Sequence, residues 1–75
     1  MAQIDELINK GKTLLEENKF DEALGFFEQA IFLEPTNPDL WNLKGVALRS
    51  MGRYDEAIDC FNKSLEIEPR DKQAS

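Results

Sequence analysis

Two stretches decide the fold: residues 7–35, LINKGKTLLEENKFDEALGFFEQAIFLEP, and residues 41–69, WNLKGVALRSMGRYDEAIDCFNKSLEIEP. With an offset of 34 residues and no gap, the chain matches itself at 10 of the 31 positions from Asp5 to Pro35. Unrelated segments of average composition would share roughly two. The chain therefore contains an internal repeat, and a period of 34 residues is typical of stacked repeat architectures.

Both halves of each repeat have the periodicity of a helix. In the opening half, apolar or small residues recur every three or four positions, which places them on one helical face. They are Ile4, Leu7, Ile8, Gly11, Leu14 and Leu15. Each repeat closes on a proline, Pro35 or Pro69, which ends a helix because it cannot donate to the hydrogen-bond ladder. We expect four helices, near residues 3–17, 21–34, 38–51 and 55–68.

Turn residues stand between these helices. Asn18 and Gly52 occupy matched positions, and both residue types tolerate the left-handed backbone that ends helices. Asn37 followed by Pro38 is a capping side chain next to a proline in the first helical position. Because the connections are short, we expect neighbouring helices to be antiparallel.

Small residues recur where the helices are expected to meet. Gly11 is repeated as Gly45, and Ala23 as Ala57. A glycine inside a helix costs about 1 kcal/mol relative to alanine, so its recurrence indicates close approach of a partner helix. The sequence predicts an all-α fold of two stacked antiparallel helix-turn-helix hairpins, with four helices in total.

The composition indicates one small soluble domain. The chain has 75 residues, and its net charge of −6 comes from 15 acidic and 9 basic side chains. Nucleic acid and anionic membranes both attract clustered Lys and Arg, so we expect neither as a partner. The negative charge either steers a basic partner or serves solubility.

The residues needed for common catalytic chemistry are missing. The sequence has no histidine, which excludes Ser-His and Cys-His nucleophile pairs. We find no glycine-rich phosphate loop and no metal-ligand spacing, so we expect no enzyme, no cofactor and no metal. Cys60 is the only cysteine, and its apolar neighbours indicate a buried thiol. No secretory signal opens the chain and no apolar run is long enough to span a bilayer, so we expect a cytoplasmic location.

The order and spacing of the repeated residues resemble the tetratricopeptide repeat family. The second repeat carries Trp41, Gly45, Leu48, Gly52, Tyr54, Ala57, Phe61 and Pro69. The resemblance places repeats at residues 4–37 and 38–71, followed by a short tail at 72–75. It implies a right-handed α-solenoid that acts as a scaffold for protein binding. Departures from the family pattern are mild, such as Leu7 for tryptophan and Lys10 and Lys44 for leucine.

The resemblance also implies where a partner would bind. In such a stack the first helix of each repeat lines a concave groove that receives a peptide or a partner's helix. Carried onto this chain, the groove positions are Asp5, Ile8, Lys12, Leu15, Asp39, Asn42, Val46 and Arg49. The alternative is that these side chains only flank the helix contact, with Ile8 and Val46 partly in the core.

Some family members hold the acidic tails of chaperones with a clamp of lysine, asparagine and arginine. Here Ile8 stands where the first lysine would be, Lys12 where an asparagine would be, and Leu43 where the asparagine of the second repeat would be. We therefore do not expect that activity.

A second hypothesis is a structural or assembly module that acts through self-association or within a longer repeat array. Repeat stacks generally bury their faces with three or more units. Residues 70–75 align with the opening of a further repeat, and the outer side of the last helix, with Phe61 and Leu65, then lacks a neighbour. Phe32 lies on the outer side of its helix and is expected to be exposed, either without a role or as part of a self-association patch.

Overall fold

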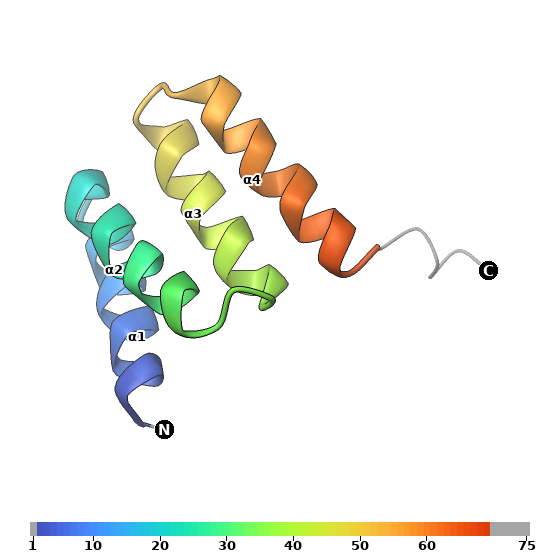
Figure 1. The fold of residues 1–75 in the computed structure, drawn as a ribbon. Helices are drawn as coiled ribbons and strands as arrows, with labels where there is room; N and C mark the ends of the chain where they lie inside the picture. The colour runs from blue at the N-terminus through green and yellow to red at the C-terminus, as the bar shows by residue number, and fades with distance from the viewer. Residues whose placement is uncertain (1, 70–75) are drawn as a thin grey trace.

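A computed structural model describes residues 2–69 and contains four helices in this range, with no strand (Figure 1). Every helix boundary lies within one residue of its predicted place, and the predicted all-α fold of two stacked hairpins is confirmed. The odd-numbered helices run in one direction and the even-numbered ones in the other. The helices are α1 (Ala2–Glu16), α2 (Phe20–Leu33), α3 (Pro38–Ser50) and α4 (Tyr54–Ile67). The predicted tail at 72–75, like the last two residues assigned to the second repeat, lies outside the described residues.

The turns follow the predicted chemistry. Asn18 and Gly52 both have positive φ angles, 64° and 82°, at the ends of α1 and α3. Asn37 caps α3, because its side-chain oxygen accepts a hydrogen bond of 3.0 Å from the backbone N–H of Asp39. Pro38 occupies the first helical position, where a missing N–H is tolerated.

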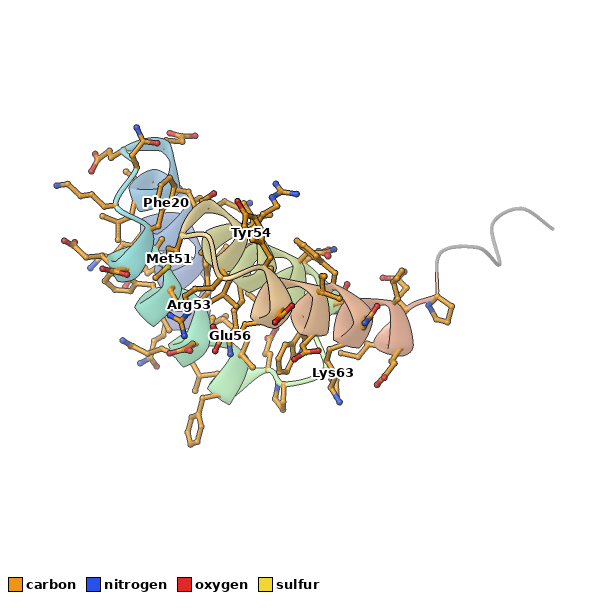
Figure 2. The ribbon with its side chains drawn as sticks, turned by 90° about the horizontal axis from the view of Figure 1, so that it is seen from above. Phe20, Met51, Arg53, Tyr54, Glu56 and Lys63 are labelled. Carbon is orange, nitrogen blue, oxygen red and sulfur yellow. The ribbon has the colours of Figure 1, made fainter. Side chains whose placement is uncertain are left out.

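The helices α2 and α4 begin one residue earlier than expected. The N–H of Ala23 donates to the carbonyl of Lys19 at 3.0 Å, and that of Ala57 donates to Arg53 at 3.1 Å. These bonds bring the aromatic residues Phe20 and Tyr54 into the first helical position (Figure 2). Neither Lys19 nor Arg53 caps its helix with a side-chain hydrogen bond.

Each hairpin is closed by a phenylalanine ring lying on a glycine. A Cβ atom added to Gly45 would lie 2.5 Å from Cε1 of Phe61, and one added to Gly11 would overlap the ring of Phe27. The close approach inferred from the recurring glycines is therefore present. The ring fills that space, while Ala23 is fully buried within α2.

The second helix of the first hairpin holds the two hairpins together. α2 packs extensively on both α1 and α3, whereas α4 packs extensively on α3 alone. The buried apolar cluster comes from α2, α3 and α4 and contains Ala23, Leu24, Phe27, Ala47, Leu48, Ala57 and Cys60. This arrangement covers α2 from two sides and leaves one side of α4 without a neighbour among the described residues.

The loop between the hairpins is held by a tryptophan. Nε1 of Trp41 donates a hydrogen bond of 2.8 Å to the carbonyl oxygen of Pro35. This bond ties the end of the first repeat to the beginning of the second and helps fix how the hairpins stack. None of the helices in residues 2–69 is both long and apolar enough to cross a membrane.

Candidate functional site

The eight predicted groove residues all lie on α1 and α3, four on each helix. The charged ones are exposed, and the other four are half-buried. The exposed set is Asp5, Lys12, Asp39 and Arg49, and the half-buried set is Ile8, Leu15, Asn42 and Val46. Every predicted position is thus at least partly accessible in the described structure.

α1 and α3 run in the same direction on one side of α2 (Figure 1). Both helices pack on α2, and they do not pack extensively against one another. The aspartates Asp5 and Asp39 lie in the first turns of these helices, whereas Lys12 and Arg49 lie toward the other end. The surface that the two helices share therefore has an acidic end and a basic end.

Two of the eight side chains also take part in packing. Leu15 packs against the buried apolar cluster. The guanidinium of Arg49 lies over the ring of Phe61, 5.8 Å from the ring centroid. A cation over an aromatic face contributes about 0.5–1 kcal/mol at an exposed site. The alternative that groove positions flank a helix contact therefore applies to Leu15, and Arg49 is held in place by α4.

Three of the four matched pairs of groove positions differ between the repeats, and the fourth pair, Asp5 and Asp39, is identical. Ile8 aligns with Asn42, and Lys12 aligns with Val46. By contrast, the glycines and phenylalanines that close the hairpins are identical in both repeats. Residue types also change at some other packing positions, such as Leu24 and its match Ile58, so it is the contact between glycine and phenylalanine that both repeats keep.

The comparison with protein families agrees with this geometry. Models described as tetratricopeptide repeat match residues 4–37 and, in tandem, residues 38–71. The chain belongs to the tetratricopeptide repeat family. A search of curated proteins finds no match to this chain. Tetratricopeptide repeats are generally scaffold modules for protein–protein interaction, which is the coarse functional class of this molecule.

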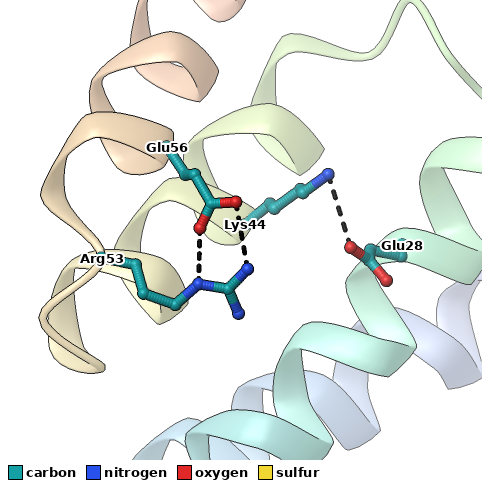
Figure 3. Close-up of polar contacts among 4 residues, drawn as sticks. All are labelled: Glu28, Lys44, Arg53 and Glu56. Carbon is teal, nitrogen blue, oxygen red and sulfur yellow. Dashed lines mark hydrogen bonds and ion pairs between the residues drawn. The ribbon is translucent and has the colours of Figure 1, made fainter.

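The tetratricopeptide repeats of this chain carry a polar cluster that the sequence did not predict. Nζ of Lys44 lies 3.5 Å from a carboxylate oxygen of Glu28, so an ion pair joins α3 of one repeat to α2 of the other (Figure 3). Arg53 and Glu56 form a second, two-point pair, with Nη2 3.0 Å from Oε2. These residues line a hollow together with Trp41 and other side chains of α3 and α4.

The charges in this cluster neutralise one another. Lys44 and Lys63 both lie over the ring of Trp41, at 5.5 Å and 6.0 Å from its centroid. The hollow is lined by three cations and three carboxylates, so it offers no excess charge to a ligand; they are Lys44, Arg53 and Lys63, and Glu28, Glu56 and Asp59. The signal that the sequence did carry was Lys44 in a place where the family commonly has leucine. Its partner on the preceding repeat could not be inferred from one chain.

Hydrogen bonding and burial shift the pKa values of two acidic groups in this region. The hydrogen bond from Arg53 lowers the pKa of the exposed Glu56 carboxyl. Burial raises the pKa of the Cys60 thiol, which favours its protonated and unreactive form. The predicted burial of Cys60 is confirmed. Among the described residues, no group of three or more side chains is arranged to hold a metal ion.

Proposed function

We propose that the chain binds an extended peptide or a helix of a partner protein in the groove between α1 and α3. The observation that carries this proposal is that three of the four matched groove pairs change residue type, while both repeats keep the glycine and the phenylalanine that close each hairpin. Ile8 and Val46 supply half-buried apolar contacts, and Lys12 and Arg49 stand beside them as exposed cations. Such a mixture suits an amphipathic segment, which docks apolar anchors and pairs its charges at the rim.

The charge order of the groove sets the direction of the ligand. Asp5 and Asp39 lie near the N-terminal ends of α1 and α3, and Lys12 and Arg49 lie further along. A bound segment therefore places its basic side chains beside the aspartates and its acidic side chains beside Lys12 and Arg49. Like charges in the reverse orientation repel, which gives specificity in addition to affinity.

The proposal is tested with a displayed library of random peptides and a groove variant. The variant combines Ile8→Ala, Val46→Ala and Arg49→Ala, and Gln29→Ala on α2 serves as the control. Peptides selected on the native chain are expected to bind the variant at least about tenfold more weakly, equivalent to about 1.4 kcal/mol, with Kd measured by fluorescence anisotropy. Unchanged Kd values in a variant of native helicity would place the binding surface elsewhere.

A second measurement checks the direction of binding. Each selected peptide is compared with a version whose acidic and basic residues are exchanged. The exchanged peptide is expected to bind the native chain more weakly. Its affinity should recover when all four groove charges are reversed, with Asp5 and Asp39 changed to Lys and Lys12 and Arg49 changed to Glu. Equal affinity for both peptides would show that the charges of the groove do not orient the ligand.

A further inference from the structure

The large apolar side chains that remain exposed in residues 2–69 form two groups, one on α4 and one at the end of α2. Tyr54, Ile58 and Leu65 lie on α4, at the C-terminal end. Phe32, which is 86% exposed, and Leu33 lie at the end of α2, where they line a hollow with α1. The predicted exposure of Phe32 is confirmed. Apolar side chains that gather in this way mark interaction surfaces more often than scattered ones do.

The stripe on α4, here called the α4 face, consists of Tyr54, Ile58 and Leu65. These residues are spaced by four and seven positions and so share one side of the helix. One repeat earlier, on α2, the matched Leu24 packs in the buried cluster with Ala47 and Leu48 of α3. Leu24 is only 9% exposed, while the matched Ile58 is 53% exposed. The α4 face is therefore the side on which the stack would receive another first helix.

The predicted place of Phe61 on the outer side of the last helix is wrong. The sequence placed it with Leu65 on the outer side of the last helix. In the structure its ring lies against Gly45 and under Arg49 of α3, and the residue is half-buried. It belongs mainly to the seam inside the second hairpin, because the missing side chain of Gly45 admits the ring.

The opposite end of the stack carries the complementary surface. The surface here called the α1 face consists of four residues of α1 and one of α2: Leu7, Lys10, Thr13, Leu14 and Phe26. All of them except Leu7 line one hollow. The matches of the α1 residues on α3 are Trp41, Lys44, Ala47 and Leu48, which pack toward α2. Ala47 is fully buried, whereas the matched Thr13 is exposed. The α1 face is thus a copy of the surface that α2 occupies inside the chain.

We propose that copies of this chain associate head to tail, with the α4 face of one copy packed on the α1 face of the next. The junction continues the α2–α3 interface already present inside the chain. In it Ile58 takes the place of Leu24, and Thr13 of the next copy takes the place of Ala47. Such an interface joins two different surfaces, so it leaves a free α4 face at one end and a free α1 face at the other. The assembly grows with concentration and does not stop at a closed pair.

Charges at the two faces agree with this register. Inside the chain, Lys44 pairs with Glu28 across the interface. One repeat further, Asn62 stands in the place of Glu28 and faces Lys10 of the next copy. Asp59 and Glu66 lie one helical turn to either side of Asn62, within the range of the flexible lysine side chain. The Lys10 amine therefore meets an acidic surface.

Two charged variants, each confined to one face, test the proposal. Ile58→Glu removes the α4 face, and Thr13→Glu removes the α1 face; both positions are exposed, so the isolated copy keeps its packing. Ser50→Glu adds the same charge to an exposed position on α3, which belongs to neither face. Mass is measured by sedimentation equilibrium from micromolar to millimolar concentration, and folding by far-ultraviolet circular dichroism.

We expect the average mass of the native chain and of Ser50→Glu to rise with concentration. Each face variant alone should stay a folded monomer. An equimolar mixture of the two face variants should form a one-to-one complex, because each supplies the face that the other has lost. A native chain that stays monomeric at millimolar concentration would overturn the proposal. So would a Thr13→Glu variant that still dimerises by itself, since that result indicates two α4 faces meeting each other.

Discussion

α2 and α4 carry the same pattern of residues and lie in different surroundings. Leu24 of α2 is 9% exposed and its match Ile58 on α4 is 53% exposed, although both are large aliphatic residues. Phe27 is completely buried, while its match Phe61 is half-buried. The difference comes from α3, which covers α2 and has no counterpart over α4 among residues 2–69. In this fold the burial of a repeated residue is decided by the next helix in the stack.

The largest expected effect is the difference in stability loss between Phe27→Ala and Phe61→Ala. Truncating a buried phenylalanine to alanine costs about 3–5 kcal/mol, and a domain of this size has a total stability of roughly 4–11 kcal/mol. Phe27→Ala should therefore remove a large share of the total stability, whereas Phe61→Ala should lower the urea midpoint by less. Urea titration followed by circular dichroism gives both values. Equal losses at the two positions would contradict the comparison.

A smaller difference is expected at the matched glycines. A methyl group added to a tight contact costs about 1–3 kcal/mol, and alanine returns about 1 kcal/mol through its helix propensity. Gly11→Ala should destabilise more than Gly45→Ala, because the fully buried Phe27 ring cannot move aside and the half-buried Phe61 ring can. Thermal unfolding of the two variants tests this order. The reverse order would mean that burial does not restrict the rings.

The starts of α2 and α3 also differ. Asn37 caps α3 through its side chain, whereas Lys19 at the start of α2 makes no such bond. Replacing a capping asparagine by alanine costs about 1 kcal/mol. We expect Asn37→Ala to lower the free energy of unfolding by about this amount. Lys19→Ala should change it much less, with both values measured in urea. A larger loss for Lys19→Ala would refute the assigned cap.

The smallest effect concerns the exposed pair in the second repeat. Arg53 pairs with Glu56, whereas Lys19 at the matched place lies 3.8 Å from Glu17. The pKa of Glu56 is lowered by its hydrogen bond to Arg53. The pair therefore adds to the free energy of unfolding at a pH above the pKa that Glu56 has in the unfolded chain. This contribution is lost as the pH falls through the lower pKa that Glu56 has in the folded chain. Carboxyl chemical shifts recorded by NMR should show the Glu56 pKa rising in Arg53→Gln. An unchanged pKa would exclude the pair as its cause.

The fold was largely predictable because the signals that determine it are local and occur twice. Asn18, Gly52 and the Asn37–Pro38 pair fix the turns, and the recurring glycines mark the seams. Contacts between repeats were harder to predict. The Glu28–Lys44 pair joins residues that no motif connects. The half-burial of Phe61 depends on how far its ring enters the space above Gly45.

The candidate groove remains a prediction that rests on the family resemblance. The positions on α1 and α3 follow from the resemblance, and their exposure agrees with access to a ligand. The packing of Leu15 and the contact between Arg49 and Phe61 could not be predicted, since both depend on side-chain directions in three dimensions. The choice of partner depends on a second molecule, which is not encoded in this chain.

Hydrogen exchange of backbone amides tests the central comparison most directly. The native chain is studied by NMR at a concentration where sedimentation shows a monomer, so that no second copy covers α4. We predict that amides in the middle of α2 exchange more slowly than the matched amides of α4, because α2 is held from two sides. Equal protection in the two helices, or slower exchange in α4, would contradict the claim that the neighbouring helix decides how firmly each repeat is held.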